Sequence, residues 1–272
     1  MTQKSKQKSL QKTIKKEFTV NNNATLKVDN SYGNINIVTY TGNKIIIEVT
    51  IKTSSNDAEK AQDKLNDITV DFSATNDMVY AKTMFSESKS KSWWSWGKND
   101  NVNMEINYLI KLPITNNVDL NNDYGSITLD KLEGRAVINC DYGKITTKEL
   151  MADNNYLSFD YTNNSYFEYI KSGKINADYS DYTVAKTKYL EVTADYTKST
   201  IKIAEDVKYN CDYGSMTVEN VNNLTGNGDY LTLVIGDVYK NIQLDSDYGS
   251  IKIGRMTAYA GNVAIQSNYA GI

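Results

Sequence analysis

Residues 242–253 read IQLDSDYGSIKI, and this stretch decides the fold. Apolar and polar residues alternate before the Asp-Tyr pair, and after Gly249 and Ser250 the alternation resumes in a new phase. Alternation with a period of two is the pattern of a β-strand with one buried face. The stretch therefore predicts a strand, a corner and a second strand, with Gly249 taking the positive φ that a tight bend requires.

The Asp-Tyr pair recurs through the second half of the chain at a nearly constant interval. Its tyrosines are 17 to 19 residues apart until the last step, which is 21. The pairs are Asp123-Tyr124, Asp141-Tyr142, Asp160-Tyr161, Asp178-Tyr179, Asp195-Tyr196, Asp212-Tyr213, Asp229-Tyr230 and Asp247-Tyr248, and Asn268-Tyr269 continues the series. An earlier copy, Ser31-Tyr32-Gly33, stands alone. The interval predicts a mainly β protein, a parallel β-solenoid of about 18-residue coils.

Stacking such coils in register places like residues above like. By parity the tyrosines share the inward face with the aliphatic residues, so we expect them to stack as an aromatic ladder at the corner. Small residues come two positions before most of the tyrosines, among them Cys140 and Cys211. These two cysteines lie four coils apart, roughly 19 Å at one strand spacing per coil, so we expect buried fillers rather than a disulfide.

The chain divides into three parts. Residues 1–18 are polar and basic without an apolar core, so they do not form a signal peptide and are expected to be a disordered leader. Residues 19–117 hold the first coil and an α+β capping region, in which Asn56 and Glu59 predict the capping box of a helix. Residues 118–272 form the solenoid of Asp-Tyr-Gly coils. A cap is expected because the end of a solenoid is an open sheet edge.

The composition limits the possible functions. The sequence has a net charge of −3 and contains no histidine, which excludes Ser/His and Cys/His nucleophilic catalysis and imidazole metal sites. It lacks the basic stripe of a nucleic-acid binder and any apolar run long enough to span a membrane. Strict repetition without a local cluster of ionisable groups further predicts that the protein is not an enzyme.

Two groups of residues are candidates for binding. Trp93, Trp94 and Trp96 lie among Ser, Lys and Asn in a predicted loop. Exposed tryptophans on a rigid scaffold stack on sugar rings or enter a membrane interface, whereas tryptophans that fold back would cover the end of the core. Both alternatives are open.

The second candidate is the aspartate column that precedes the tyrosines: Asp123, Asp141, Asp160, Asp178, Asp195, Asp212, Asp229 and Asp247. Carboxylates stacked about 4.8 Å apart repel one another, so the column needs compensation. The expected form is a hydrogen bond from backbone N–H groups of the same turn to each carboxylate. Bridging Ca²⁺ is the alternative, although the glycine-rich calcium repeat is missing.

The sequence resembles the adhesin domains of unknown function found in surface and secreted proteins of Bacteroidetes and other bacteria. The resemblance lies in residues 30–37, in the strand of residues 45–52 with its helix, and in the Asp-Tyr-Gly-Ser-Ile coils, and it extends from about residue 20 to the end. It implies an exported β-solenoid in the periplasm, on the outer surface or outside the cell, without catalytic residues. The missing signal peptide departs from that pattern.

These observations lead to one expected function and two alternatives. We expect a non-enzymatic envelope or surface binding module, with a glycan or a surface protein as its partner. The first alternative is a structural or regulatory envelope protein that acts through protein–protein contacts, including self-association through the open solenoid end. The second is a rod stabilised by Ca²⁺.

Overall fold

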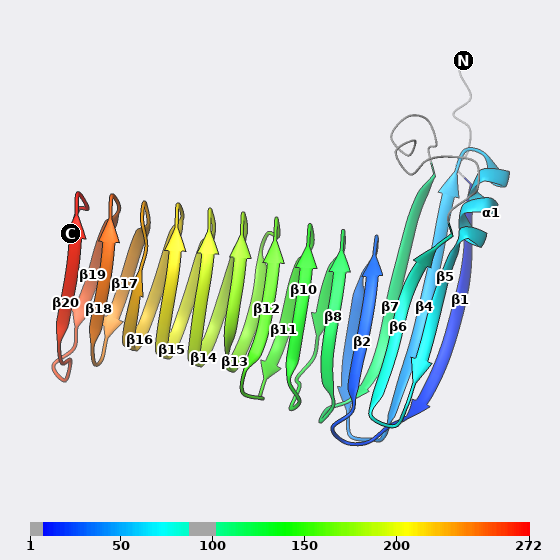
Figure 1. Ribbon diagram of the computed structural model, residues 1–272, viewed down its shortest axis with the longest axis horizontal. Coiled ribbons are helices and arrows are strands. Elements are labelled where there is room, and N and C mark those ends of the chain that lie inside the picture. The colour runs from blue at the N-terminus through cyan, green and yellow to red at the C-terminus, as the bar shows by residue number, and fades with distance from the viewer. Residues whose placement is uncertain (1–7, 87–101) are drawn as a thin grey trace, which may run out of the picture.

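The structure, a computed structural model, describes residues 8–86 and 102–272 and is an elongated solenoid with one end capped (Figure 1). The N-terminal part contains α1 (Ala58–Asp67), β1 (Lys8–Thr19), β2 (Thr25–Ser31), β3 (Ile35–Tyr40), β4 (Lys44–Ser55), β5 (Ile68–Ala74), β6 (Met78–Phe85) and β7 (Asn103–Pro113). The coils continue with β8 (Asn117–Asp123), β9 (Ser126–Leu129), β10 (Ala136–Asp141), β11 (Lys144–Leu150), β12 (Asn155–Asp160), β13 (Ser165–Asp178), β14 (Asp181–Asp195), β15 (Lys198–Asp212), β16 (Ser215–Asn227), β17 (Thr232–Val238), β18 (Ile242–Asp247), β19 (Ser250–Met256) and β20 (Val263–Asn268).

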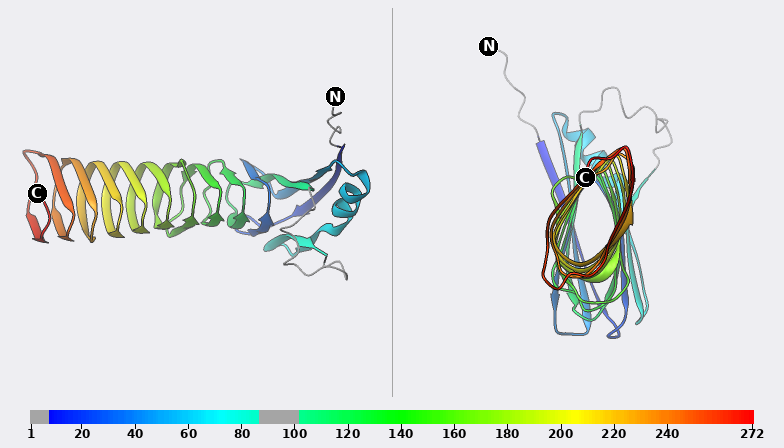
Figure 2. Two further views of the ribbon diagram at one scale, coloured as in Figure 1. Left: turned by 90° about the horizontal axis from the view of Figure 1, so that it is seen from above. Right: turned by 90° about the vertical axis from the view of Figure 1, so that its left-hand side faces the viewer.

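Each coil has two strand segments that meet at a tyrosine corner, and each segment belongs to a different parallel sheet. The strands before the corner pair in the order β6, β2, β8, β10, β12, followed by the second halves of β13–β16 and then β18 and β20. The strands after the corner pair from β7 through β3, β9 and β11 to β19. Seen along the axis, the coils superimpose as a flattened oval (Figure 2). The predicted parallel β-solenoid is thus confirmed.

The core fills the space between the two sheets. Inward residues two, four and six positions before the tyrosines from Tyr32 to Tyr213 are buried, and Leu120, Ile138, Leu157 and Ile175 stack directly on one another. Size is balanced between neighbouring coils: a Cβ added to Gly226 would lie 2.3 Å from the ring of Tyr209, which is only 2% exposed. A large side chain in one coil therefore occupies the space that a small one leaves in the next.

The N-terminal end is closed by antiparallel strands and a helix. β4 pairs with β7, β1 pairs with β4, and β5 pairs with β6, all antiparallel. Residues 8–18, expected to belong to a disordered leader, instead form β1, so that prediction was wrong. Its side chains Leu10, Ile14 and Phe18 pack against the core, and this alternation within a lysine-rich segment is what places the strand on the sheet edge.

The helix begins one residue later than predicted. Asp57, not Asn56, is the N-cap, and its carboxylate accepts hydrogen bonds from the backbone N–H groups of Glu59 and Lys60. At the other end, Lys12 of β1 donates to the carbonyl oxygens of Leu65 and Ile68 at 2.5 and 2.6 Å. A cation at the helix C-terminus satisfies carbonyl groups that have no partner within the helix, so β1 also fixes α1.

Candidate functional site

Ten tyrosines form a continuous ladder along the corner of the solenoid. Neighbouring rings are stacked with centroids 4.9–5.3 Å apart and with interplanar angles of 0–11°. The members are Tyr32, Tyr124, Tyr142, Tyr161, Tyr179, Tyr196, Tyr213, Tyr230, Tyr248 and Tyr269. The predicted ladder exists, but its predicted inward position was wrong: the rings from Tyr124 to Tyr248 are 47–53% exposed.

The backbone of the corner explains this outward position. Every ladder tyrosine has a φ between 49° and 61°, in the left-handed region, whereas no glycine among the described residues has a positive φ. The predicted role of glycine was therefore wrong, and the left-handed residue interrupts the alternation on which the parity argument depended. Position 125 requires glycine for a different reason, which is the close approach of the neighbouring coil. An added Cβ would lie 1.8 Å from the carbonyl oxygen of Gly33.

The aspartate column joins one coil to the next. The carboxylate Oδ1 of Asp141 accepts the backbone N–H of Asp160 at 3.1 Å, and Asp160 in turn accepts the N–H of Asp178 at 3.2 Å. The same bond continues through Asp195, Asp212 and Asp229, and Asp247 accepts the N–H of Asn268. The bonds thus run between coils and not, as predicted, within each turn.

This arrangement has an electrostatic cost. Partial burial and then the neighbouring carboxylates raise the pKa of Asp123, Asp160 and Asp195 above the usual value. Across residues 8–86 and 102–272, no group of three or more acidic or cysteine side chains is arranged to hold a metal ion. Six of the eight carboxylates accept a backbone N–H group of the next coil: Asp141, Asp160, Asp178, Asp195, Asp212 and Asp247.

The two cysteines are free and buried, as predicted. Burial raises the pKa of Cys140 and of Cys211 to about 12. Because the thiolate is the reactive form, both are inert fillers beneath the corner.

The outward side chains of the sheet that runs from β6 to β20 make a flat polar surface, which we call the asparagine face. Its central column contains Asn121, Asn139, Asn176, Asn210 and Asn227. The amide of Asn227 donates to Asn210 at 2.8 Å, and that of Asn121 donates to Asp29 at 3.3 Å. Such rows offer donors and acceptors at one-strand intervals.

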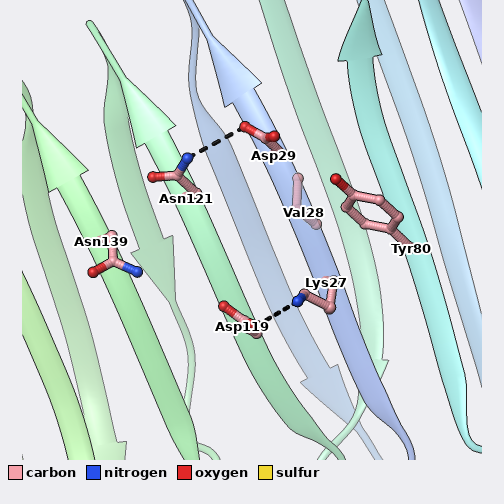
Figure 3. A pocket seen from close by; sticks show the side chains of 7 residues that line it. All are labelled: Lys27, Val28, Asp29, Tyr80, Asp119, Asn121 and Asn139. Carbon is pink, nitrogen blue, oxygen red and sulfur yellow. Dashed lines mark hydrogen bonds and ion pairs between the residues drawn. The ribbon is translucent and has the colours of Figure 1, made fainter.

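Two shallow hollows lie on the asparagine face. The first, of about 320 Å³, lies over β6, β2, β8 and β10 beside Tyr80 (Figure 3). Its charged groups are already paired: Lys27 with Asp119 at 3.0 Å and Asp29 with Lys82 at 3.3 Å. These pairs raise the pKa of both lysines, and they leave the hollow without an unbalanced charge.

The second hollow, of about 240 Å³, lies over β12, β13 and β14, beside the residue that precedes β10. It is lined by Arg135, Asn154, Asn155, Tyr156, Ser172, Gly173, Lys174, Tyr189 and Glu191. The sequence analysis missed this set, because its members come from four coils and none of them belongs to the Asp-Tyr motif. The one feature of the sequence that could have pointed to this hollow is that Arg135 is one of only two arginines in the chain.

The other predicted site residues, Trp93, Trp94 and Trp96, lie outside the described residues. Within the part of the chain that the structure describes, no helix has the length and apolar character needed to cross a bilayer.

Solved structures that resemble this chain include three from Parabacteroides species. A "putative adhesin" from Parabacteroides merdae is 14% identical, with a TM-score of 0.43 and 96% of both chains covered. A second "putative adhesin", from Parabacteroides distasonis, is 14% identical with a TM-score of 0.41 over 95% of both chains. A "putative lipid binding protein" from Parabacteroides distasonis is 11% identical with a TM-score of 0.34 over 94% of this chain and 96% of the other.

No family model matches this sequence, and no curated protein matches it either. At these identities and TM-scores, no ligand or activity is transferred to this chain.

Proposed function

We propose that this protein is a non-enzymatic binding module of the bacterial envelope or cell surface, in which a rigid solenoid displays a recognition surface. The observation that carries the proposal is the asparagine face, where polar side chains recur in register over eleven strands from β6 to β20. A surface of this kind can contact an extended partner at many equivalent points. Export is supported by the sequence resemblance to domains of surface and secreted proteins.

The non-enzymatic assignment is supported by how the ionisable groups are used. On the asparagine face, Lys27, Lys82 and Lys174 are each paired with a carboxylate of an adjacent strand. The aspartate column is bonded to backbone N–H groups of the next coil. Catalysis requires an acid or a base that is free to exchange protons with a substrate, and paired groups serve that role poorly.

Trp93, Trp94 and Trp96 are retained as a second proposed contact region on the grounds of their sequence. The test is a glycan and peptidoglycan binding screen of the wild type beside the triple variant Trp93→Ala/Trp94→Ala/Trp96→Ala. Tyr259→Ala is the matched control, because Tyr259 is 93% exposed and lies between β19 and β20, outside the tyrosine ladder. Melting curves show whether each variant is folded.

The outcomes separate the two proposed contact regions. Binding that is lost in a folded triple variant and kept in Tyr259→Ala assigns recognition to the tryptophans. Binding that survives in the triple variant assigns it to the solenoid. A wild type that binds nothing in the screen contradicts the binding-module proposal for glycans.

A second candidate function is contact between proteins by strand addition. It is favoured by β20, which among the described strands pairs along its length only with β18 and whose Val263 is 48% exposed. An unpaired strand edge is a template for another strand. If the screen is negative and light scattering shows concentration-dependent association, this candidate replaces the first.

A further inference from the structure

The second hollow on the asparagine face contains an arginine whose terminal guanidinium nitrogens the fold does not use. Arg135 is exposed, and its Nε donates to the carbonyl oxygen of Asn154 at 2.7 Å. Its terminal nitrogens have no protein partner among the described residues, and it forms no ion pair there. Arg255, the other arginine of the chain, is instead bound to the carboxylate of Asp237 through two nitrogens.

The group that fixes Arg135 is itself held in an unusual conformation. Asn154 has a φ of 58°, and in the described part of the chain only Asn164 shares a positive φ outside the tyrosine ladder. The N–H of Asn154 is bonded to the hydroxyl of Ser172 at 3.1 Å. Asparagine adopts the left-handed region more readily than most residues, and here the Ser172 contact holds it there. The guanidinium is therefore anchored by a carbonyl whose own position is fixed.

Two aromatic rings line the same hollow, and they differ from those of the ladder. Tyr189 is 43% exposed, and neither it nor Tyr156 is stacked on another ring among the described residues. The hydroxyl of Tyr156 accepts a hydrogen bond from the amide of Asn176 at 2.8 Å, which fixes the ring. The faces of the ladder tyrosines are covered by their neighbours, whereas Tyr189 offers ring surface to a ligand.

The charge of the hollow selects the kind of ligand. Lys174 and Glu191 neutralise each other at 3.5 Å, so Arg135 leaves the lining with one unbalanced positive charge. A guanidinium matches a carboxylate through two parallel hydrogen bonds. A volume of about 240 Å³ lies below the ~300–1,000 Å³ of sites for drug-sized molecules, so it suits one ring of a longer chain.

We propose that this hollow binds a carboxylate-bearing sugar, such as a uronic acid residue, within an acidic glycan. This inference rests on the proposed binding function and names its ligand class. Arg135 binds the carboxylate, Tyr189 packs against the sugar ring, and Lys174 and Glu191 hydrogen-bond its hydroxyl groups. The open hollow lets the rest of the glycan extend along the asparagine face, where the amide of Asn139 provides a further contact.

The test is isothermal titration of the full chain with hexamers of galacturonic acid and of mannuronic acid. Neutral maltohexaose and the peptide hexaglutamate serve as comparison ligands. The variants are Arg135→Gln, which keeps a polar side chain, and Tyr189→Ala, and the matched control is Arg255→Gln. Both arginines are exposed, so circular dichroism should show the same fold in every variant.

We expect at least one hexuronate to bind, at least tenfold more weakly to Arg135→Gln and Tyr189→Ala, and with unchanged affinity to Arg255→Gln. Binding should weaken as salt is raised, because it includes an ion pair. Absence of binding to both hexuronates overturns the proposal, as does equal affinity for maltohexaose or for Arg135→Gln. Hexaglutamate that binds as tightly as the hexuronates assigns the site to acidic peptides instead. Any of these results leaves the wider binding function standing if the glycan screen is positive.

Discussion

In a β-strand an alanine variant is usually more stable than a glycine variant. At a ladder tyrosine we expect the opposite order of stability. Tyr196 has a φ of 51° and stacks on Tyr179 and Tyr213 at centroid distances of 4.9 and 5.1 Å. Both Tyr196→Ala and Tyr196→Gly remove these two stacks, each of which contributes about 0.5–1.5 kcal/mol. Because the wild-type tyrosine carries the same backbone strain as alanine, Tyr196→Ala should be less stable than the wild type by about 1–3 kcal/mol.

The difference between the two variants isolates the backbone contribution. Alanine keeps the left-handed conformation at a cost of about 1–2 kcal/mol, whereas glycine adopts it freely but loses about 0.4–1 kcal/mol through the entropy of the unfolded chain. The glycine variant should therefore be more stable than the alanine variant by about 1 kcal/mol.

Urea unfolding followed by circular dichroism measures this difference, with Thr193 as the matched control position. Thr193 lies in the extended part of β14, so Thr193→Gly should be less stable than Thr193→Ala by about 0.5–1 kcal/mol. Equal m-values are needed, because coils that unfold separately would change the slope. If Tyr196→Ala is as stable as Tyr196→Gly, the backbone strain assigned to the corner is wrong.

Three further changes test the contacts between coils. Gly125→Ala should lower stability by about 1–3 kcal/mol through overpacking against the Gly33 carbonyl. Gly271→Ala, with nothing within 4 Å of its added Cβ, should leave stability unchanged. Equal urea midpoints for the two variants would contradict this reasoning. Lowering the pH from neutral toward 3.8 should raise stability, since the folded Asp160 and Asp195 have raised pKa values and bind protons more readily than the unfolded chain does. Below 3.8 stability should fall, because Asp130 and Asp153, whose pKa values are lowered by lysine partners, lose those pairs; Asp160→Asn/Asp195→Asn should show a smaller rise in a series of urea midpoints. Millimolar Ca²⁺ should leave the melting temperature nearly unchanged, since carboxylates of the column already accept backbone N–H groups. Calcium bound at a hundred times its Kd would add about 2.7 kcal/mol to the free energy of unfolding. A stabilisation of that size would establish the calcium-stabilised rod.

The recurrence of the Asp-Tyr pair was enough to predict the coils, their register and the stacking of the tyrosines, because each depends only on like residues lying above like. The buried cysteines followed from the same register. The sequence could not show which residue of the corner is left-handed. Glycine is the usual choice there, but its place beside the tyrosine answers a steric demand from the preceding coil. The backbone of the folded coil shows that the tyrosine takes the left-handed conformation, whereas the glycine meets the need for a residue without a side chain.

The remaining errors arose where contacts cross between distant segments. The lysines of residues 8–18 concealed the alternation of Leu10, Ile14 and Phe18, which becomes a strand only when β4 offers an edge. The aspartate bonds were assigned within one turn because sequence proximity suggested it, whereas the acceptor and donor are 17 to 19 residues apart in the coils from Asp141 to Asp229. The Arg135 hollow joins residues of four coils and has no local motif.

The architecture also indicates where a ligand can be recognised. The inward columns are committed to the core, the ladder tyrosines cover one another's faces, and the column aspartates hold the next coil. Change at any of these positions is opposed by the neighbouring coils on both sides. Outward positions of the asparagine face carry no such constraint, because their side chains differ from coil to coil without disturbing the backbone pairing. Arg135, Tyr156 and Tyr189 occupy such positions. Specificity in this solenoid should therefore arise from local irregularities on a regular face, and not from the repeated motif that builds it.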